Sequence, residues 1–192
     1  MEWNQERMSA ALERAVEAAR RMIREHGNLD GMLATLHPAN DSGFTVFGLG
    51  LPDKPEDRDL MAEVVRGIAE ELDAIMVTLA VSAWVLLPGD IDSIDLAEST
   101  SGLSDPSEVL LVSASHRLLG ESCRSERIRR EGSSVTFDAI AASPDIALDD
   151  RFAHILSPQR APISAAARAQ AHEIASGIRR GRVGNGEGPF RH

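Results

Sequence analysis

The sequence predicts an α+β domain: a mostly antiparallel sheet of about six strands, with two helices packed on it and a further helix at the C-terminal end. Three observations support this fold class. Apolar residues recur at helical spacing in two long segments, and several short apolar or alternating runs are bounded by turn residues. The elements follow the order α-β-β-α-β-β-β-β, which is typical of a mostly antiparallel sheet with helices packed on it.

The first predicted element is an amphipathic helix over Met8 to Glu25. Its apolar side chains recur every three or four residues, and most of its charged side chains fall on the other face. Ser9 is the candidate N-cap, and Gly27 ends the helix. Two strands follow, Met32 to His37 and Phe44 to Leu49, joined by a turn-rich link that is typical of a hairpin.

The second helix begins near Pro55 and continues through Asp73. It leads into Ala74 to Leu87, the most apolar stretch of the chain, which contains no charge, glycine or proline. This run is shorter than the about 20 residues that a membrane-spanning helix needs. Its β-branched residues favour a strand, and a buried extension of the preceding helix is the alternative.

Both faces of this central strand are apolar, so we expect a cover on each side. We expect the two amphipathic helices to cover one face. The other face, with Met76 and Trp84, would be covered by the C-terminal helix of this chain or of a second copy. That helix carries a narrow apolar stripe that includes Ile174 and Ile178. We therefore predict a partner face at Met76, Trp84, Ile174 and Ile178.

Three further strands complete the predicted sheet, after an acidic connection at Pro88 to Ser107 that contains no basic residue. They lie at Val109–Ser115, Ser122–Arg130 and Val135–Ala141. We assign residues 1–142 to the α+β domain and residues 143–192 to a C-terminal extension. The extension is expected to hold a helix at about 164–180 and a mobile Gly/Arg-rich tail.

The charge is unevenly distributed along the 192 residues, whose net value is −10. Residues 151–192 carry seven arginines against two glutamates, whereas the preceding part is strongly acidic. An acidic body repels phosphate, which disfavours nucleic acid as a partner but leaves it open. The single cysteine excludes an intramolecular disulfide. The N-terminus lacks signal-peptide features, so we expect a cytoplasmic protein without a membrane partner.

Several segments carry a resemblance. The Arg-rich helix ending in EHG, the hairpin, the next helix and the strand closing on SAWV resemble, in this order, a loose set of bacterial proteins. In those proteins an acidic loop also precedes a strand like EVLLVSASHR and a polar hairpin. The likeness covers roughly residues 8–141. It implies the strand order and no activity, because a shared fold does not fix function.

Catalytic chemistry is not predicted from the residues that would suggest it. Ser113, Ser115 and His116 invite a hydrolase interpretation, which requires a nucleophile and a base within hydrogen-bond reach. The G-x-S-x-G pattern is absent, and the adjacent Ser115 and His116 should point to opposite faces of a strand. We therefore name no catalytic residue, although a site assembled from distant residues remains an alternative.

No metal or cofactor site is predicted either. His37, His116, His154 and His172 have none of the spacings of metal-binding motifs. The acidic loop at Asp90 to Asp105 lacks the pattern of a calcium-binding loop, and Gly48-Leu-Gly50 lacks both phosphate-loop patterns.

Two groups of arginines are candidate anion contacts. Arginines of the polar hairpin alternate with glutamates, which predicts cross-strand pairing for Arg124, Arg127, Arg129 and Arg130. Arg179, Arg180 and Arg182 have fewer acidic neighbours and are the better candidate, although a cationic helix C-terminus is favoured without any ligand.

The function expected from the sequence is that of a non-enzymatic module for protein interaction or self-association. Its partner would be another protein or a second copy of the chain. Nucleic-acid binding through the Arg-rich tail is the alternative, and an enzyme with a site not visible in the sequence is a further one.

Overall fold

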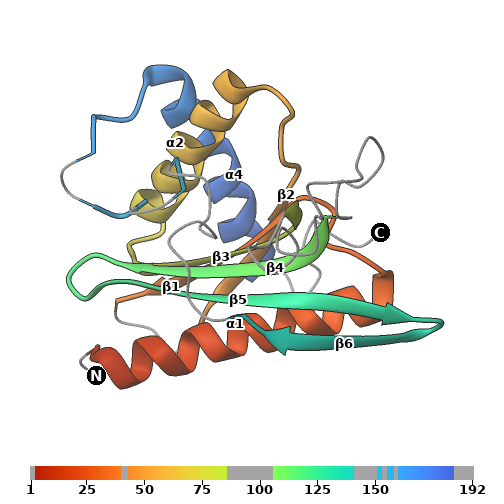
Figure 1. Cartoon of the computed structure of the whole chain (residues 1–192). Helices are drawn as coiled ribbons and strands as arrows, with labels where there is room; N and C mark the ends of the chain where they lie inside the picture. The colour runs from red at the N-terminus through yellow and green to blue at the C-terminus, as the bar shows by residue number, and fades with distance from the viewer. Residues whose placement is uncertain are drawn as a thin grey trace, which may run out of the picture.

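The computed structural model describes residues 3–39, 43–85, 106–140, 151–152, 155–157 and 160–183. The described elements confirm the predicted class and order (Figure 1). They are α1 (Gln5–His26), β1 (Met32–Pro38), β2 (Thr45–Leu49), α2 (Pro55–Glu71), β3 (Ala74–Val85), β4 (Ser107–His116), β5 (Gly120–Glu131), β6 (Ser134–Ala139) and α4 (Ala165–Val183).

The strands form one antiparallel sheet in the order β2-β1-β3-β4-β5-β6. Strand β3 pairs with β1 rather than with β2, so the first hairpin is attached to the later strands through β1. The last four strands are consecutive neighbours in a meander. Strands β2 and β6 are therefore the two edges of the sheet.

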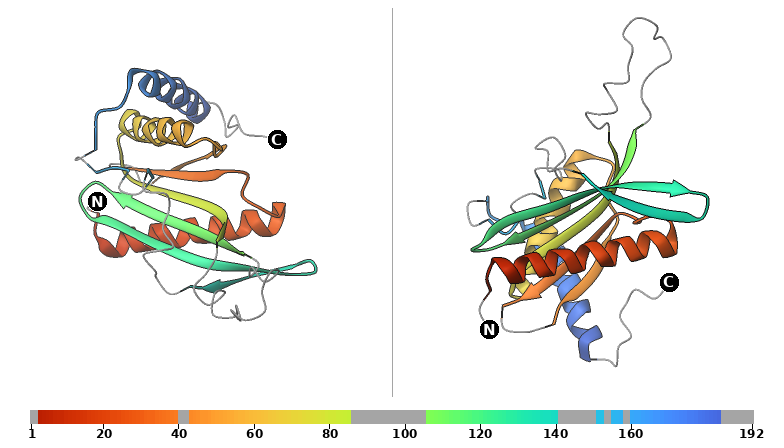
Figure 2. Two further views of the ribbon diagram at one scale, coloured as in Figure 1. Left: turned by 45° about the horizontal axis from the view of Figure 1, so that its top comes forward. Right: turned by 60° about the horizontal axis from the view of Figure 1, so that its bottom comes forward.

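The helices lie on both sides of the sheet, with α1 on one face and α2 and α4 on the other (Figure 2). In β3, Met76 and Ala80 pack with α1, whereas Val77 and Leu79 pack with α2. The expectation that both amphipathic helices cover one face was therefore wrong. An apolar strand with two equivalent faces does not indicate which helix covers which face.

Helix α4 packs on α2 and shares its core with the sheet. Its apolar stripe, from Ile163 just before the helix to Ile178, belongs to the cluster that includes residues of α2 and β3. The two helices approach closely at Gly67, where a Cβ atom would lie 2.6 Å from the Cβ of Ala171. The apolar stripe of α4, which the sequence analysis placed in a partner face, is thus covered within the chain.

Helix α1 begins earlier than predicted, and its N-cap is Asn4 rather than Ser9. The Asn4 side chain accepts a hydrogen bond from the backbone N–H of Arg7 at 2.9 Å, which satisfies one of the free donors of the first turn. Ser9 is an exposed residue within the helix. The helix ends at Gly27, as predicted, where φ is 91° and the glycine N–H bonds to Ile23.

Parts of the predicted organisation lie outside the described residues. These are the acidic segment Asp90–Asp105, residues 143–150 and the tail from residue 184. The division of the chain at residue 142 therefore stays a prediction.

Candidate functional site

The three arginines predicted to contact an anion differ in their surroundings. Arg179 donates a hydrogen bond to the backbone oxygen of Glu71, and its guanidinium lies 3.2 Å from the Glu71 carboxylate. His172 also contacts Glu71 at 3.2 Å, and these two contacts hold the pKa of Glu71 below its usual range. Arg180 is exposed, and the side chain of Arg182 lies outside the described residues. Arg179 therefore joins α4 to α2.

The four residues predicted as one partner face lie apart. Met76 is fully buried beneath α1. Ile178 is buried and Ile174 partly buried on the opposite side of the sheet, in the cluster of α2. Trp84, near the end of β3, is 68% exposed. A partner can reach Trp84 in the folded chain, but it cannot reach Met76.

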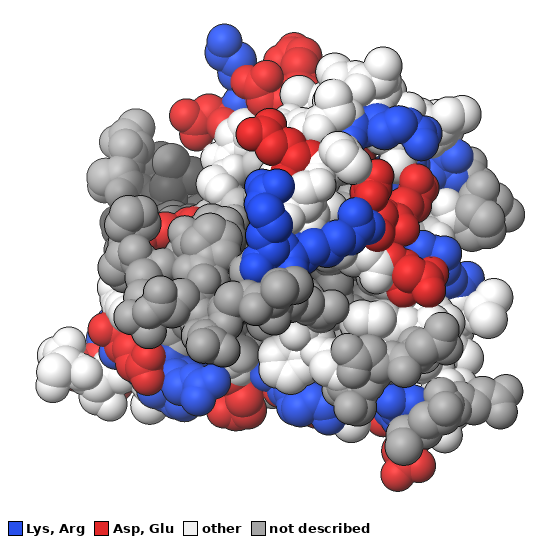
Figure 3. All heavy atoms as spheres, turned by 180° about the vertical axis from the view of Figure 1, so that it is seen from behind, with Lys and Arg blue, Asp and Glu red and all other residues white. Residues whose placement is uncertain are grey.

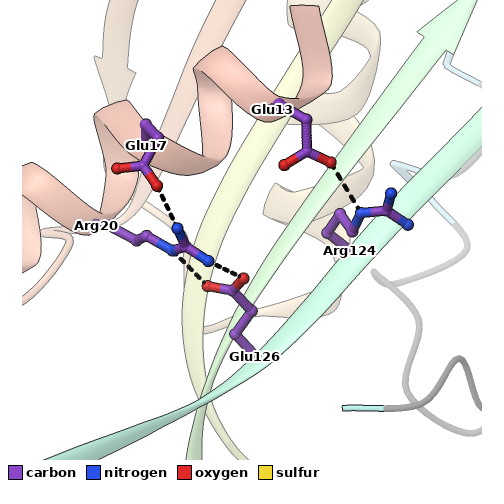
Figure 4. A network of polar contacts seen from close by, with 5 residues as sticks. All are labelled: Glu13, Glu17, Arg20, Arg124 and Glu126. Atoms are coloured by element: carbon purple, nitrogen blue, oxygen red, sulfur yellow. Dashed lines mark hydrogen bonds and ion pairs between the residues drawn. The ribbon is translucent and has the colours of Figure 1, made fainter. Parts of the chain in front are cut away.

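The arginines of the β5–β6 hairpin have carboxylate partners on several elements. Arg129 pairs with Asp138 across the hairpin, as predicted. Arg124, however, pairs with Glu13 of α1 at 3.0 Å, and Glu126 receives a hydrogen bond of 2.8 Å from Nε of Arg20 (Figure 4). These contacts hold α1 on the sheet, so the pairing is only partly between strands.

A second buried carboxylate is paired in a similar way. Glu108 of β4 accepts two hydrogen bonds from Arg130, at 2.7 and 2.8 Å, and the same guanidinium donates to the backbone oxygen of Gly27 at 2.6 Å. The bond to Glu108 raises the pKa of Arg130, and the bond to Glu126 raises that of Arg20. These arginines secure the helix ends and strands of the fold, which is a structural role.

Ser115 and His116 are consecutive residues of β4, and their side chains have separate partners. The Ser115 hydroxyl accepts a hydrogen bond from the backbone N–H of Leu156 at 3.4 Å. His116 Nδ1 accepts from the N–H groups of Leu118 and Leu119, both at 3.1 Å, so the neutral ring carries its proton on Nε2. The imidazole is oriented by its own turn and not toward Ser115.

A buried aromatic cluster, not recognised from the sequence, contains two histidines. In the strand register, His37 of β1 and His116 of β4 both lie opposite Met76 of β3, so the three form one row. The Trp3 ring lies over them, with centroid distances of 5.7 Å to His37 and 5.4 Å to His116. Predicting this cluster requires the strand register and the position of the residues before α1. No local sequence motif provides either.

This environment keeps both rings neutral at neutral pH. Burial, together with the smaller effect of the positive charges of Arg14 and Arg7, lowers the pKa of His37 to about 4. Burial also lowers the pKa of His116.

An open hollow of about 530 Å³ lies at the end of α2 and is bounded by Glu71, Ile163 and His172. Two smaller cavities lie beside the same helix. One, of about 300 Å³, is bounded by Gly67, Glu71 and Arg168. The other, of about 260 Å³, is bounded by Asp59, Glu63 and Arg151 among others. Arg151 pairs with Asp59 at 2.6 Å, and Glu63 accepts a hydrogen bond from Ser164 N at 3.0 Å. The carboxylates of the second cavity are thus used within the chain.

The edge strand β2 carries no charge, and exposed apolar side chains lie on it and just before it. Its sequence is TVFGL, and Phe47 and Leu49 pack toward α2. On the other side, Val46 is 45% exposed, and Phe44, which precedes β2, is 55% exposed. A Cβ atom on Gly48 would meet nothing within 4 Å. We call Phe44, Val46 and Gly48 the edge patch.

The opposite edge has a different character. The exposed side chains of β6 include Ser134, Thr136 and Asp138, and Asp138 is paired with Arg129. Charged and polar residues on an edge strand discourage pairing with another strand, whereas an uncharged apolar edge favours it. Only β2 of the two edges therefore has the chemistry to accept a further strand.

The charges, the possible metal ligands and the hydropathy of the helices can be compared with the edge patch only over the part of the chain that the structure describes. On the face shown in Figure 3, basic and acidic side chains lie next to one another. Within the described residues, no group of three His, Cys, Asp or Glu side chains could hold a metal ion. His154 lies outside them. No helix in the described ranges is long and apolar enough to cross a membrane.

Comparison of the chain with protein families, with curated proteins and with solved structures found no match.

Proposed function

We propose that this protein is a non-enzymatic interaction module and that it binds a β-strand of a protein partner along the edge of β2. The observation that carries the proposal is the edge patch beside an uncharged edge strand. Phe44 and Val46 are both about half exposed, and β2 pairs with β1 on its other side.

The chemistry of an edge strand determines what it can bind. Alternate residues of such a strand turn their N–H and C=O groups away from the sheet, where an added strand can pair with them. Side chains of the added strand that fall on the edge-patch side would contact Val46 and Phe44. The ladder of backbone bonds supplies affinity, and the apolar contacts supply the preference for alternating apolar residues.

The rest of the sheet supports this location. Helix α1 packs mainly on β3, β4, β5 and β6. The edge patch, on β2, therefore lies beyond the strands that α1 mainly covers. The alternative of nucleic-acid binding through the C-terminal arginines has less support, because Arg179 is held by Glu71. Trp84 is exposed, but it lies near the end of β3, where no backbone edge accompanies it in the described residues.

The test uses a fluorescent peptide of alternating threonine and valine with a lysine at each end, titrated with the full chain and followed by anisotropy. We expect binding to the wild-type protein and its loss in Val46→Lys, because a lysine at the edge opposes strand addition. Val46 is half exposed, so the fold should tolerate the change. The control is Ser134→Lys at the β6 edge, which should bind as the wild type does. Equal loss in both variants, or no binding by the wild type, would overturn the proposal.

A further inference from the structure

We infer that the strand bound at the β2 edge is β2 of a second copy of this chain, antiparallel to the first and related to it by a two-fold axis at Val46. This inference rests on the proposed function and names its partner. The absence of charge from Thr45 to Leu49 is the first argument. Two copies of a charged edge would place like charges opposite each other, but two copies of β2 do not.

Strand geometry limits the possible registers. Directly opposite residues in an antiparallel pair lie on the same face of the sheet. A symmetric pair therefore has a residue at its centre that lies opposite itself. For the five-residue strand Thr45–Leu49, an axis at Val46, Phe47 or Gly48 leaves at least three residues of each strand paired. An axis at Gly48 places Val46 opposite Gly50 and so gives no apolar pair on the exposed side, which leaves Val46 and Phe47.

The axis at Val46 gives the better apolar contact. It places Val46 opposite Val46 of the second copy and Phe44 opposite the second copy's Gly48. Phe44 lies beside His37 of its own sheet, with ring centroids 6.1 Å apart, and the second copy's Gly48 leaves room for it, since a Cβ there meets nothing within 4 Å. An aromatic side chain over a glycine of the neighbouring strand is a favourable cross-strand pair.

Diagonal contacts distinguish the two registers further. With the axis at Val46, Phe44 is also a diagonal neighbour of the second copy's Val46, so the four exposed apolar side chains form one cluster. With the axis at Phe47, Phe44 lies opposite Gly50, and its diagonal neighbour within the strand is Gly48. Phe44 would then meet no side chain of the second copy, because both of these positions are glycines.

Cysteine cross-linking tests both the partner and the register. In a Cys123→Ser background, which removes the only native thiol, Val46→Cys should form a disulfide-linked dimer under mild oxidation. With the axis at Phe47, the disulfide would instead form between Val46→Cys and Gly48→Cys in a mixture of the two variants. Thr136→Cys, at the exposed β6 edge, is the matched control and should stay monomeric.

Sedimentation of the wild-type chain at rising concentration provides an independent measurement. We expect reversible dimers, and dissociation about tenfold or more easier in Val46→Lys, because two lysines would face each other at the axis. A monomeric wild type without the Val46→Cys cross-link would overturn the inference. If that protein still binds the threonine–valine peptide through β2, the proposed function stands with a different partner. If it does not, both fail.

Discussion

Arg20 of helix α1 donates a hydrogen bond of 2.8 Å to Glu126 of strand β5, at a place where the glutamate is only 6% exposed. A second bond joins the same two side chains, and Glu17 of α1 holds the guanidinium from the other side. A carboxylate so deeply buried needs a charged partner, because removal from water is costly for an isolated ion. This pair therefore fixes where α1 lies on the sheet.

Removing one partner of this pair should destabilise the fold strongly. We expect Arg20→Met to lower the free energy of unfolding by about 3 kcal/mol, since it leaves Glu126 buried without a partner. The double variant Arg20→Met/Glu126→Leu should recover most of that loss. Urea denaturation followed by circular dichroism measures both.

The exposed pair of Arg124 and Glu13 gives the control. Both side chains are about half exposed, so Arg124→Met should cost less than about 1 kcal/mol. Equal losses for Arg20→Met and Arg124→Met would contradict a role for burial in the first pair.

The contact between Gly67 and Ala171 predicts an unusual response to a helix-favouring substitution. Glycine to alanine within a helix commonly stabilises by about 1 kcal/mol. At Gly67 the added Cβ would lie 2.6 Å from the Cβ of Ala171, so α4 would have to shift. We expect Gly67→Ala to lower the free energy of unfolding by about 1–3 kcal/mol.

Two further variants locate this effect at the helix contact. The compensating change Gly67→Ala/Ala171→Gly should restore part of the stability. Gly177→Ala, in α4 where nothing lies within 4 Å of the added atom, should cause no loss. Thermal denaturation of the three variants measures these differences. A stabilised Gly67→Ala would show that α4 does not pack on α2 in this way.

The buried His37 predicts a loss of stability in acid. Its pKa is about 4 in the folded chain, against an ordinary value of 6.5, so the unfolded chain binds the proton more readily. The free energy of unfolding therefore has its full value, as far as His37 is concerned, above pH 6.5. It decreases as the pH falls toward 4, by an amount on the order of 3 kcal/mol. His116 contributes in the same direction, since its pKa is also lowered.

Fluorescence of Trp3, in a Trp84→Phe background, reports unfolding directly at this cluster, because its ring contacts both histidines. His37→Leu should remove much of the change in the free energy of unfolding between pH 6.5 and 4. Replacement of the exposed His26 by glutamine should leave it unchanged. An unaltered acid dependence in His37→Leu would assign it to other groups.

The sequence predicted which segments are helices and strands better than it predicted which face of the sheet each helix covers. Periodicity locates α1 and β3, but β3 is apolar on both faces and so does not show that α1 covers Met76 while α2 covers Val77. The role of β2 as an edge depends on β3 pairing with β1, which is a long-range contact. The absence of charge in TVFGL was visible in the sequence, but it became informative only when the edge was known.

The N-terminal cap of α1 predicts how two similar polar residues differ. Asn4 accepts a hydrogen bond from Arg7 N at 2.9 Å, whereas Ser9 lies on the exposed face within the helix. Asn4→Ala should therefore cost about 1 kcal/mol, because a donor of the first turn loses its partner. Ser9→Ala should be neutral or slightly stabilising, since alanine has the higher helix propensity. The free energy of unfolding in urea distinguishes them: a larger loss for Ser9→Ala would place the start of the helix where the sequence first indicated it.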